Sequence, residues 1–275
     1  MARTLDFSDH RRDLGDNRYI YAVVSRRARG LSIGVNLNPD KVCNFDCPYC
    51  QVDRTVPGGD ARIDLDVLDA ELDRLLGWVA DGTLWQHAPF DTVAPALRRV
   101  ADIAFAGDGE PTTPPEFPGA AERVRAVRDR FGLDVPVRLL TNATMLHRER
   151  VRAALPLFDE VWGKLDAGTE AWFQRVDGTR FPFARVLANL EETARIRPIT
   201  IQTMLCTLDG AGPTDEELDA WAARVHTIAA AGTVAEVQLY TVARKPSDAG
   251  VGPVTREVLE AARSRISGIQ AHTYV

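Results

Sequence analysis

The chain has 275 residues, of which 45% are hydrophobic and 26% charged, a composition typical of globular domains and unlike that of disordered chains. This length suits one large domain or two small ones. The net charge of −6 argues against a surface built mainly to hold a nucleic-acid backbone. No stretch approaches the roughly 18 apolar residues that cross a bilayer, and no signal peptide opens the chain. We therefore expect a cytoplasmic protein without membrane contact.

Short apolar strands alternate with amphipathic helices along the chain. The first clear strand, 31–37, alternates larger hydrophobic residues with smaller ones and ends at Asn38-Pro39. Helices are predicted at 64–80 and 92–100, before a strand at 103–106. The further predictions are a helix at 120–131, a strand at 135–140, a helix at 148–155, a strand at 160–165, a helix at 184–195, a strand at 198–205, a helix at 215–230 with Thr214 as its N-cap, and a strand at 234–240.

This alternation gives six βα units and an α/β fold, because strands joined by helices at this spacing run parallel. An open sheet or a barrel satisfies the pattern, but six units in this length favour a partial barrel with a lateral opening. Residues 1–30 are predicted as an N-terminal extension with a strand at 19–24 and a solvated basic cluster, Arg26-Arg27-Ala28-Arg29. Residues 31–275 are predicted as one core domain, since no Gly/Ser linker or internal repeat divides them.

Three of the four cysteines, Cys43, Cys47 and Cys50, lie within eight residues, and Cys206 stands alone. Two disulfides fit this spacing poorly, so metal ligation is the better interpretation. Soft thiolates suit both zinc and iron–sulfur clusters. A structural zinc site normally has four protein ligands and would have to borrow His87 or Cys206. A [4Fe-4S] cluster held by three cysteines keeps one iron open for a small-molecule ligand.

The Cys-x-x-x-Cys-x-x-Cys spacing, with the aromatic Tyr49 before the last cysteine, resembles the cluster motif of the radical S-adenosylmethionine (radical SAM) superfamily. The resemblance implies a partial (βα)6 TIM-like barrel with the cluster loop after the first strand. It implies that S-adenosylmethionine binds the open iron through its amino and carboxylate groups. A low-potential donor of the flavodoxin or ferredoxin type would reduce the cluster. An electron from the reduced cluster would then cleave S-adenosylmethionine to methionine and a 5′-deoxyadenosyl radical, which takes hydrogen from a substrate.

Gly107-Asp108-Gly109-Glu110, directly after the strand at 103–106, resembles the Gly-Gly-Glu segment with which the superfamily binds the methionine amino group. Asp108 stands where that pattern usually has glycine. A glycine-flanked turn lets the backbone approach a ligand closely, and Glu110 offers a carboxylate to an ammonium. The turn lacks the third glycine of a dinucleotide-binding fingerprint, so a Rossmann site is not indicated.

Two further strand ends carry candidate cofactor-binding residues. Asn142 resembles the residue that contacts the ribose hydroxyls, and an ordinary strand-to-helix turn is the alternative. Strand alternation places Lys164 and Asp166 on one face, which would be the lumen of a barrel. Lys164 would pair there with the carboxylate of S-adenosylmethionine or a substrate acid, as a cofactor-binding or catalytic residue, or form an internal salt bridge to Asp166.

The last two predicted strands carry residues whose roles the sequence does not decide. Cys206 is a candidate catalytic hydrogen-atom donor or a ligand to a second centre, but we favour a buried small hydrophobe, since free cysteine is commonly buried. No further thiols exist to hold a second cluster. Gln238 and Tyr240 share one face of the strand at 234–240, where the family places adenine and substrate contacts.

The run 164–168 and the segment 237–248 also resemble the group that includes wyosine-synthesising tRNA enzymes. Those enzymes carry extra upstream cysteines for a second cluster, and here no cysteine precedes Cys43. We predict a radical SAM enzyme acting on an unidentified small or medium-sized organic substrate. A tRNA-modifying radical enzyme is the alternative, although the acidic balance does not favour nucleic acid. A structural zinc or iron–sulfur electron-transfer protein is the alternative of another class, and it needs neither an open ligand position nor the turn at Glu110.

Overall fold

The computed structural model describes residues 5–6, 14–25, 28–244, 246 and 248–275. Arg26 and Arg27 of the basic cluster, and Lys245 and Ser247 within the 237–248 segment, lie outside the described residues. The chain divides into two compact units. The first comprises residues 1–42, 57–139 and 149–159, and the second comprises residues 43–56, 140–148 and 160–275.

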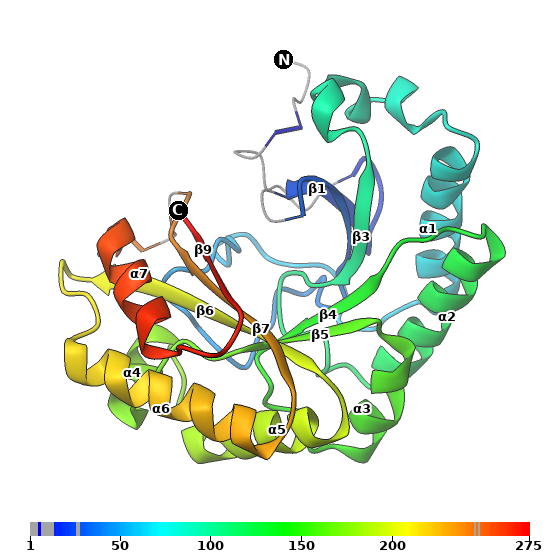
Figure 1. Cartoon of the computed structure of the whole chain (residues 1–275). Coiled ribbons are helices and arrows are strands. Elements are labelled where there is room, and N and C mark those ends of the chain that lie inside the picture. The colour runs from blue at the N-terminus through cyan, green and yellow to red at the C-terminus, as the bar shows by residue number, and fades with distance from the viewer. Residues whose placement is uncertain (1–4, 7–13, 26–27, 245, 247) are drawn as a thin grey trace. The chain divides into compact units, whose positions relative to one another are not determined.

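The first unit is a small sheet with helices. β1 pairs antiparallel with β2, whereas β2, β3 and β4 pair parallel in that order. Each parallel strand is followed by a helix, and Figure 1 shows α1 and α2 side by side. The elements are β1 (Ile20–Ser25), β2 (Gly30–Val35), α1 (Leu65–Ala80), β3 (Val100–Phe105), α2 (Phe117–Arg130), β4 (Val137–Thr141), whose last two residues belong to the second unit, and α3 (Glu149–Ala154).

Local chemistry fixes the first helix and the first strand of this unit. Asp64 caps α1, because its side chain accepts from the amides of Asp66 and Val67. Glu71, buried within α1, accepts the backbone N–H groups of Arg18 (2.7 Å), Tyr19 (3.0 Å) and Ile20 (3.0 Å) at the start of β1. The core is aromatic where Phe105, Phe117 and Phe158 pack at centroid distances of 5.0 to 6.1 Å.

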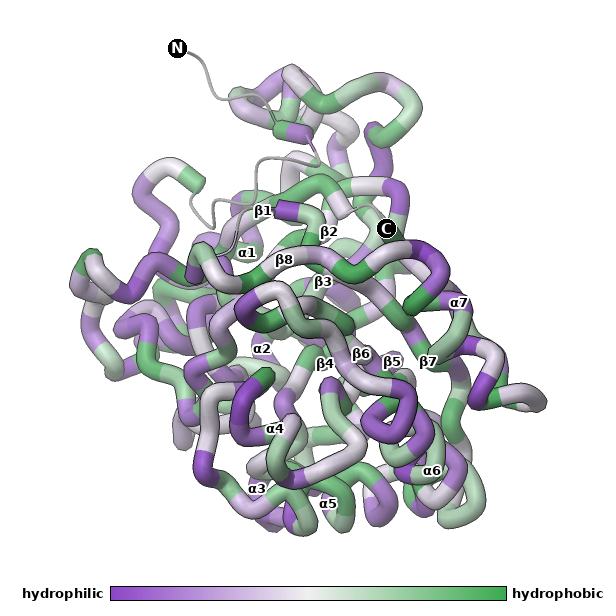
Figure 2. The backbone as a smooth tube through the Cα atoms, turned by 90° about the vertical axis from the view of Figure 1, so that its left-hand side faces the viewer, coloured by the Kyte–Doolittle hydropathy of each residue, from purple (hydrophilic) through white to green (hydrophobic). Residues whose placement is uncertain are grey.

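The second unit has the same alternation. β5, β6, β7 and β9 pair parallel in that order, and the short β8 adds to β6 antiparallel. Figure 1 shows α6 between α5 and α7, and Figure 2 shows hydrophobic and hydrophilic residues interspersed along β7 and α7. The elements are β5 (Glu160–Lys164), α4 (Glu170–Val176), α5 (Phe183–Ile196), β6 (Ile199–Leu208), α6 (Asp215–Ala231), β7 (Val234–Thr241), β8 (Val251–Pro253), α7 (Arg256–Arg265) and β9 (Ala271–Tyr274).

The six predicted βα units are present, with β2, β3 and β4 in the first unit and β5, β6 and β7 in the second. The predicted helix at 92–100 is wrong. That region holds the last residue of one 3-10 turn, Phe90–Thr92, and a second 3-10 turn, Pro95–Leu97, before β3 begins at Val100. Pro95 has no N–H to donate and disfavours helical backbone in Ala94, so a helix cannot run through it. No helix among the described residues is long and apolar enough to span a membrane.

Candidate functional site

The cysteine loop, residues 43–50, belongs to the second unit and has no regular secondary structure. Its backbone closes a turn in which Cys50 N donates to Cys47 O at 2.9 Å. All four cysteines of the chain are thiols outside disulfides, with the three of the loop half-buried and Cys206 buried. The position of the loop is therefore set by contacts with strand ends and connecting loops.

Asn44, directly after Cys43, supplies most of those contacts. Its Nδ2 donates to Thr144 Oγ1 at 2.7 Å, and its Oδ1 accepts from Asn142 Nδ2 at 2.7 Å. Thr179 Oγ1 donates to its carbonyl oxygen at 3.3 Å. Asn142 is buried, and its own Oδ1 accepts from the amide and hydroxyl of Thr144. In this structure the predicted ribose contact thus orients the loop that follows Cys43.

A glycine lets a second connecting loop reach the cysteines. Gly178 has a φ of +56°, and a Cβ at this position would lie 1.9 Å from Asp46 O. The approach brings Asp177 against the loop, where its carbonyl accepts from Asp46 N at 3.2 Å. A side chain at position 178 would separate the two loops, so glycine is required here for close contact as well as for the left-handed backbone.

The three sulfur atoms face different partners. Cys43 Sγ accepts from the amide of Phe45 at 3.5 Å, and Cys50 Sγ accepts from Arg54 Nη1 at 3.4 Å. Cys47 Sγ lies 3.7 Å from Asp177 Oδ1. Burial raises the pKa of Cys47 well above its ordinary value; Lys164 opposes that rise, and Asp177 adds to it. A metal ion that displaces the proton would therefore be needed to hold Cys47 as a thiolate.

Lys164, at the end of β5, stands at the centre of a charged cluster beside Cys47. Its Nζ contacts the carboxylates of both Asp166 and Asp177, whose side chains are 0% and 1% exposed. Burial alone would lower the pKa of Lys164, but the two carboxylates raise it well above its usual range. The pKa of Asp177 is raised to about 7 by burial, against the effect of Lys164. The predicted pair with Asp166 is present, and Asp177 is a partner that the sequence did not reveal.

Tyr49 joins the same cluster. Its hydroxyl donates to Asp166, whose other oxygen accepts from Met204 N at 2.9 Å. Lys164 Nζ lies 5.0 Å from the centroid of the Tyr49 ring, within the range of a cation–π contact. Burial raises the pKa of the Tyr49 hydroxyl well above 10, and the charge of Asp166 raises it further. Tyr49 is thus a neutral donor that ties the cysteine loop to β5 and β6.

One transverse row of polar residues crosses the sheet of the second unit. Register pairs Lys164 with Gln202, Gln202 with Gln238, and Gln238 with His272. Gln202 Nε2 donates to Gln238 Oε1 at 3.2 Å, and both side chains are buried. Cys206 is 1% exposed on β6, and burial raises its pKa to about 12. The favoured interpretation of Cys206, a buried thiol, agrees with that burial.

The turn at 107–110 belongs to the first unit, where it forms hydrogen bonds with the loop after β2. Asp108 N donates to Asn36 Oδ1 at 3.1 Å, and Asn36 Nδ2 returns a bond to Asp108 Oδ2 at 2.8 Å. A Cβ on Gly107 or Gly109 would lie 2.2 Å from Asn36 Oδ1 or Val42 O respectively. Both glycines are therefore needed for close packing. Asp108, the departure from the family pattern, is the residue that bonds Asn36.

Glu110 and Asn38 complete this turn. Glu110 is 3% exposed, and its carboxylate accepts from the hydroxyl and amide of Thr112. Thr113 Oγ1 donates to Glu110 O at 2.7 Å, so it can only accept from Asn38 Nδ2 at 3.3 Å. That bond fixes the orientation of the Asn38 amide. Asn38 Oδ1 is left buried with no hydrogen-bond partner within the part of the chain that the structure describes.

The zinc interpretation finds no preformed site. Among the described residues, no group of three or more His, Cys, Asp or Glu side chains is placed to hold a metal ion. His87, the histidine that zinc would have borrowed, stacks on Trp78 with ring centroids 3.9 Å apart. In a [4Fe-4S] cluster each thiolate binds a different iron, so its ligands need not converge on one point. The three-cysteine donor set fits such a cluster, with N–H donors on two of its sulfurs.

Comparisons with known proteins place this α/β fold and cysteine loop in one class. The model of the Radical SAM superfamily matches residues 37–223, which include the cysteine loop, the turn at 107–110 and β5. The chain belongs to the Radical SAM superfamily. Its fold is therefore the partial TIM barrel of that family, and its class is that of enzymes that use a [4Fe-4S] cluster, S-adenosylmethionine, a reductant and a substrate. Membership decides against a purely structural zinc protein.

The curated relatives are distant. A protein of Brachyspira hyodysenteriae named GTPase Obg is 25% identical over 253 residues, which are 91% of this chain and 33% of that protein. A UPF0026 protein of Methanocaldococcus jannaschii is 28% identical over 161 residues, 57% of this chain and 43% of that protein. The matched regions thus span between a third and a half of these relatives.

Two solved structures are similar in fold alone. SuiB of Streptococcus suis, bound to S-adenosylmethionine, aligns with a TM-score of 0.58 at 11% identity, over 91% of this chain and 52% of that chain. TYW1 with a lysine-pyruvate adduct aligns with a TM-score of 0.55 at 12% identity, over 91% of this chain and 84% of that chain.

Proposed function

We propose that Cys43, Cys47 and Cys50 hold a [4Fe-4S] cluster and that the chain binds S-adenosylmethionine as cofactor or co-substrate. The observation that carries the proposal is the three-cysteine loop itself, whose sulfurs at positions 43 and 50 accept N–H bonds. Such bonds stabilise thiolate charge and tune cluster potentials. When bound and reduced, the cluster supplies the electron that cleaves S-adenosylmethionine to methionine and a 5′-deoxyadenosyl radical.

The turn at 107–110 is the proposed site of the methionine amino group. Gly107 and Gly109 keep the backbone accessible, and Asn38 Oδ1 is a buried acceptor without a partner among the described residues. An acceptor left unsatisfied in this way costs about 1–3 kcal/mol. An ammonium that donated to it would recover that cost. Asp108 and Glu110 already bond Asn36 and Thr112, so their proposed role is to hold the turn rigid and to contribute negative charge.

Lys164, Asp166 and Tyr49 are proposed to position the cysteine loop and to set the charge beside it. Tyr49 ties the loop to Asp166, and Asp166 in turn holds Lys164. Asn142 is proposed to orient Cys43 through Asn44, with a ribose hydroxyl as its further partner. Cys206 is proposed as a packed thiol, since a side chain 1% exposed with a pKa of about 12 stays protonated. The polar row from Gln202 to His272 favours a polar, small or medium-sized organic substrate.

Anaerobic reconstitution of the full chain tests the proposal. We expect about four irons and four sulfides per chain, an electron paramagnetic resonance signal that S-adenosylmethionine perturbs, and 5′-deoxyadenosine after reduction by dithionite. Cys47→Ser should abolish all three. Cys206→Ala is the matched control, since it also removes one thiol but should keep all three. Cleavage retained by Cys47→Ser, or one zinc without sulfide in the purified chain, would refute the assignment. Added tRNA that raises turnover would favour the tRNA-modifying alternative.

A further inference from the structure

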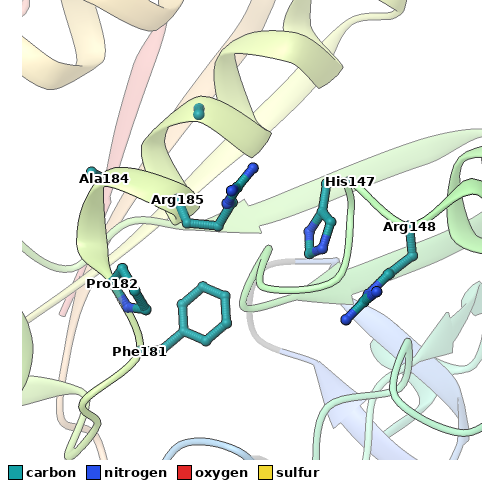
Figure 3. A pocket seen from close by; sticks show the side chains of 7 residues that line it. His147, Arg148, Phe181, Pro182, Ala184 and Arg185 are labelled. Carbon is teal, nitrogen blue, oxygen red and sulfur yellow. The ribbon is translucent and has the colours of Figure 1, made fainter.

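A cavity of about 510 Å³ lies in the second unit, and the proposed function gives it no role. Its wall is formed by His147, Arg148, Phe181, Pro182, Arg185 and two alanines of α5. Figure 3 shows Phe181 and Arg185 on one side, facing His147 and Arg148 on the other. Phe181, Pro182 and the alanines supply the apolar part of the lining, and the two arginines, here called the rim, supply its positive charge.

Both arginines of the rim are uncommitted. Arg148 and Arg185 are exposed, and neither guanidinium has a hydrogen bond or an ion pair with any residue that the structure describes. This contrasts with Arg128, Arg138 and Arg265, which pair with aspartates. Arg185 lies in the first turn of α5, whose N-cap is Pro182 and whose positive dipole end adds to the charge. A rim of this kind attracts anionic groups.

His147 lies close enough to both arginines for their charges to act on it. Partial burial lowers the pKa of His147, and the positive charges of Arg148 and Arg185 lower it further. Glu192, two turns along α5 from Arg185, opposes them weakly. His147 contacts Asn189 at 3.4 Å, and Asn189 Nδ2 donates to Ala143 O at 2.7 Å. The wall of the cavity is therefore braced to the loop that carries Asn142.

Two hydrogen-bond connections link the walls of the cavity to Asn44, the residue after Cys43. Phe181 is two residues after Thr179, which donates to Asn44 O at 3.3 Å. His147 is three residues after Thr144, which accepts from Asn44 Nδ2 at 2.7 Å. Since each residue spans at most about 3.5 Å, both walls lie within about 11 Å of groups that contact Asn44. Arg180, also exposed, stands between Thr179 and Phe181.

The geometry points to this cavity as the docking surface for the acidic face of a low-potential electron-carrying protein, with Arg148 and Arg185 as its charged contacts. The inference rests on the proposed function, because only an electron-accepting cluster needs such a partner. Apolar side chains flanked by charged groups are the usual layout of a protein interface. The chain as a whole carries −6, so an acidic partner would be repelled except at a local cationic surface. In the complex, the donor would lose one electron and the cluster would gain it, with no bond made or broken.

The test uses the reconstituted holoenzyme and a purified acidic flavodoxin as the probe. The charge reversal Arg148→Glu/Arg185→Glu should raise the Kd for oxidised flavodoxin about tenfold or more at an ionic strength of about 0.02 M, and much less at about 0.3 M. Arg148→Lys/Arg185→Lys keeps the charge and should stay within about threefold of the native Kd. The matched control is Arg195→Glu/Arg256→Glu, which makes the same change in net charge at the far end of α5 and on α7.

Electron transfer supplies the second readout. The rate of cluster reduction by flavodoxin hydroquinone should fall in the charge-reversal variant, whereas reduction by dithionite should match that of the native protein. Equal flavodoxin binding by the native and charge-reversed proteins, or an equal loss in the control, would overturn the inference. So would loss of bound inorganic phosphate or tRNA in the variant without any effect on flavodoxin. Failure of the native protein to bind iron, or to cleave S-adenosylmethionine with dithionite, would instead refute the proposed function.

Discussion

Substitution of Gly178 by alanine tests whether the contact between two loops sets the position of the cysteines. Alanine adds a Cβ whose site is now 1.9 Å from Asp46 O, and real Cβ contacts essentially never fall below 3.0 Å. Asp46 must therefore move by about 1.1 Å, or Gly178 must move away from it by as much. Ligand side chains generally have to stay within about 0.5 Å of their working geometry. We therefore expect Gly178→Ala to lose much of its capacity for iron.

The energetic cost has two parts that a control can separate. Left-handed backbone costs alanine about 1–2 kcal/mol, and loss of the bond from Asp46 N to Asp177 O costs about 1 kcal/mol more. Gly132→Ala is the control, since Gly132 has a φ of +61° and no atom within 4 Å of its Cβ position. It should pay only the backbone cost. Thermal unfolding of the apoprotein and iron content after reconstitution are the measurements. Equal destabilisation and equal iron in the two variants would refute the reasoning.

Three further outcomes follow from groups elsewhere in the chain. Burial alone would raise the pKa of Asp159, but the N–H of Val137 at 2.7 Å and the charge of Arg125 lower it. The ionised Asp159 therefore stabilises the fold above its unfolded pKa of about 3.9, and this stabilisation is lost as the pH falls through its lower pKa in the folded protein. Asp159→Asn should flatten the fall of Tm below about pH 5, because the variant has no such carboxylate to protonate. Glu71→Ala leaves three backbone donors at the start of β1 without their acceptor and should lower the free energy of unfolding by about 3 kcal/mol. Urea unfolding measures this loss, and an unchanged unfolding midpoint would contradict it. Cys206, with a pKa of about 12, has about one thiolate in 10,000 at about pH 8 and should resist iodoacetamide in the folded apoprotein, as peptide mass mapping would reveal.

The elements predicted well are those whose buried face gives a regular spacing of hydrophobic residues along the sequence. The helix expected at 215–230 is Asp215–Ala231, and Thr214 caps it by accepting from Glu217 N. Where a single residue outweighs the pattern, the prediction fails, as at Pro95. The short α4 and β8 were missed because seven and three residues are too few to show a period.

The proposed ligands are readable from sequence because they are neighbours along the chain, whereas the groups that hold them are not. Cys43, Cys47 and Cys50 form one motif, but Asn142 and Asp177 reach the loop from positions about a hundred or more residues away. Of these distant groups, only Asp177 could have been noticed in the sequence, because the Asp177-Gly178 dipeptide is typical of a turn. That pattern predicts a turn and does not predict its contact with the cysteine loop. Which surface that turn meets is decided by the packing of α4 and α5, so no local pattern encodes it.

Asp177 also changes how variants of Lys164 have to be interpreted. The sequence allowed an ammonium paired with Asp166 alone, but Lys164 stands between two carboxylates that are almost fully buried. Lys164→Met therefore leaves two buried carboxyl groups without their cation, and removal of one partner from such a pair typically costs about 3–5 kcal/mol. Loss of activity in that variant would not identify a catalytic residue. The double variant Lys164→Met/Asp177→Asn removes one of the two carboxyl groups and should recover part of the lost stability. If it also recovers cleavage of S-adenosylmethionine, Lys164 is a positioning residue. Recovered stability and iron content without cleavage would show that its ammonium contacts the cofactor or the substrate.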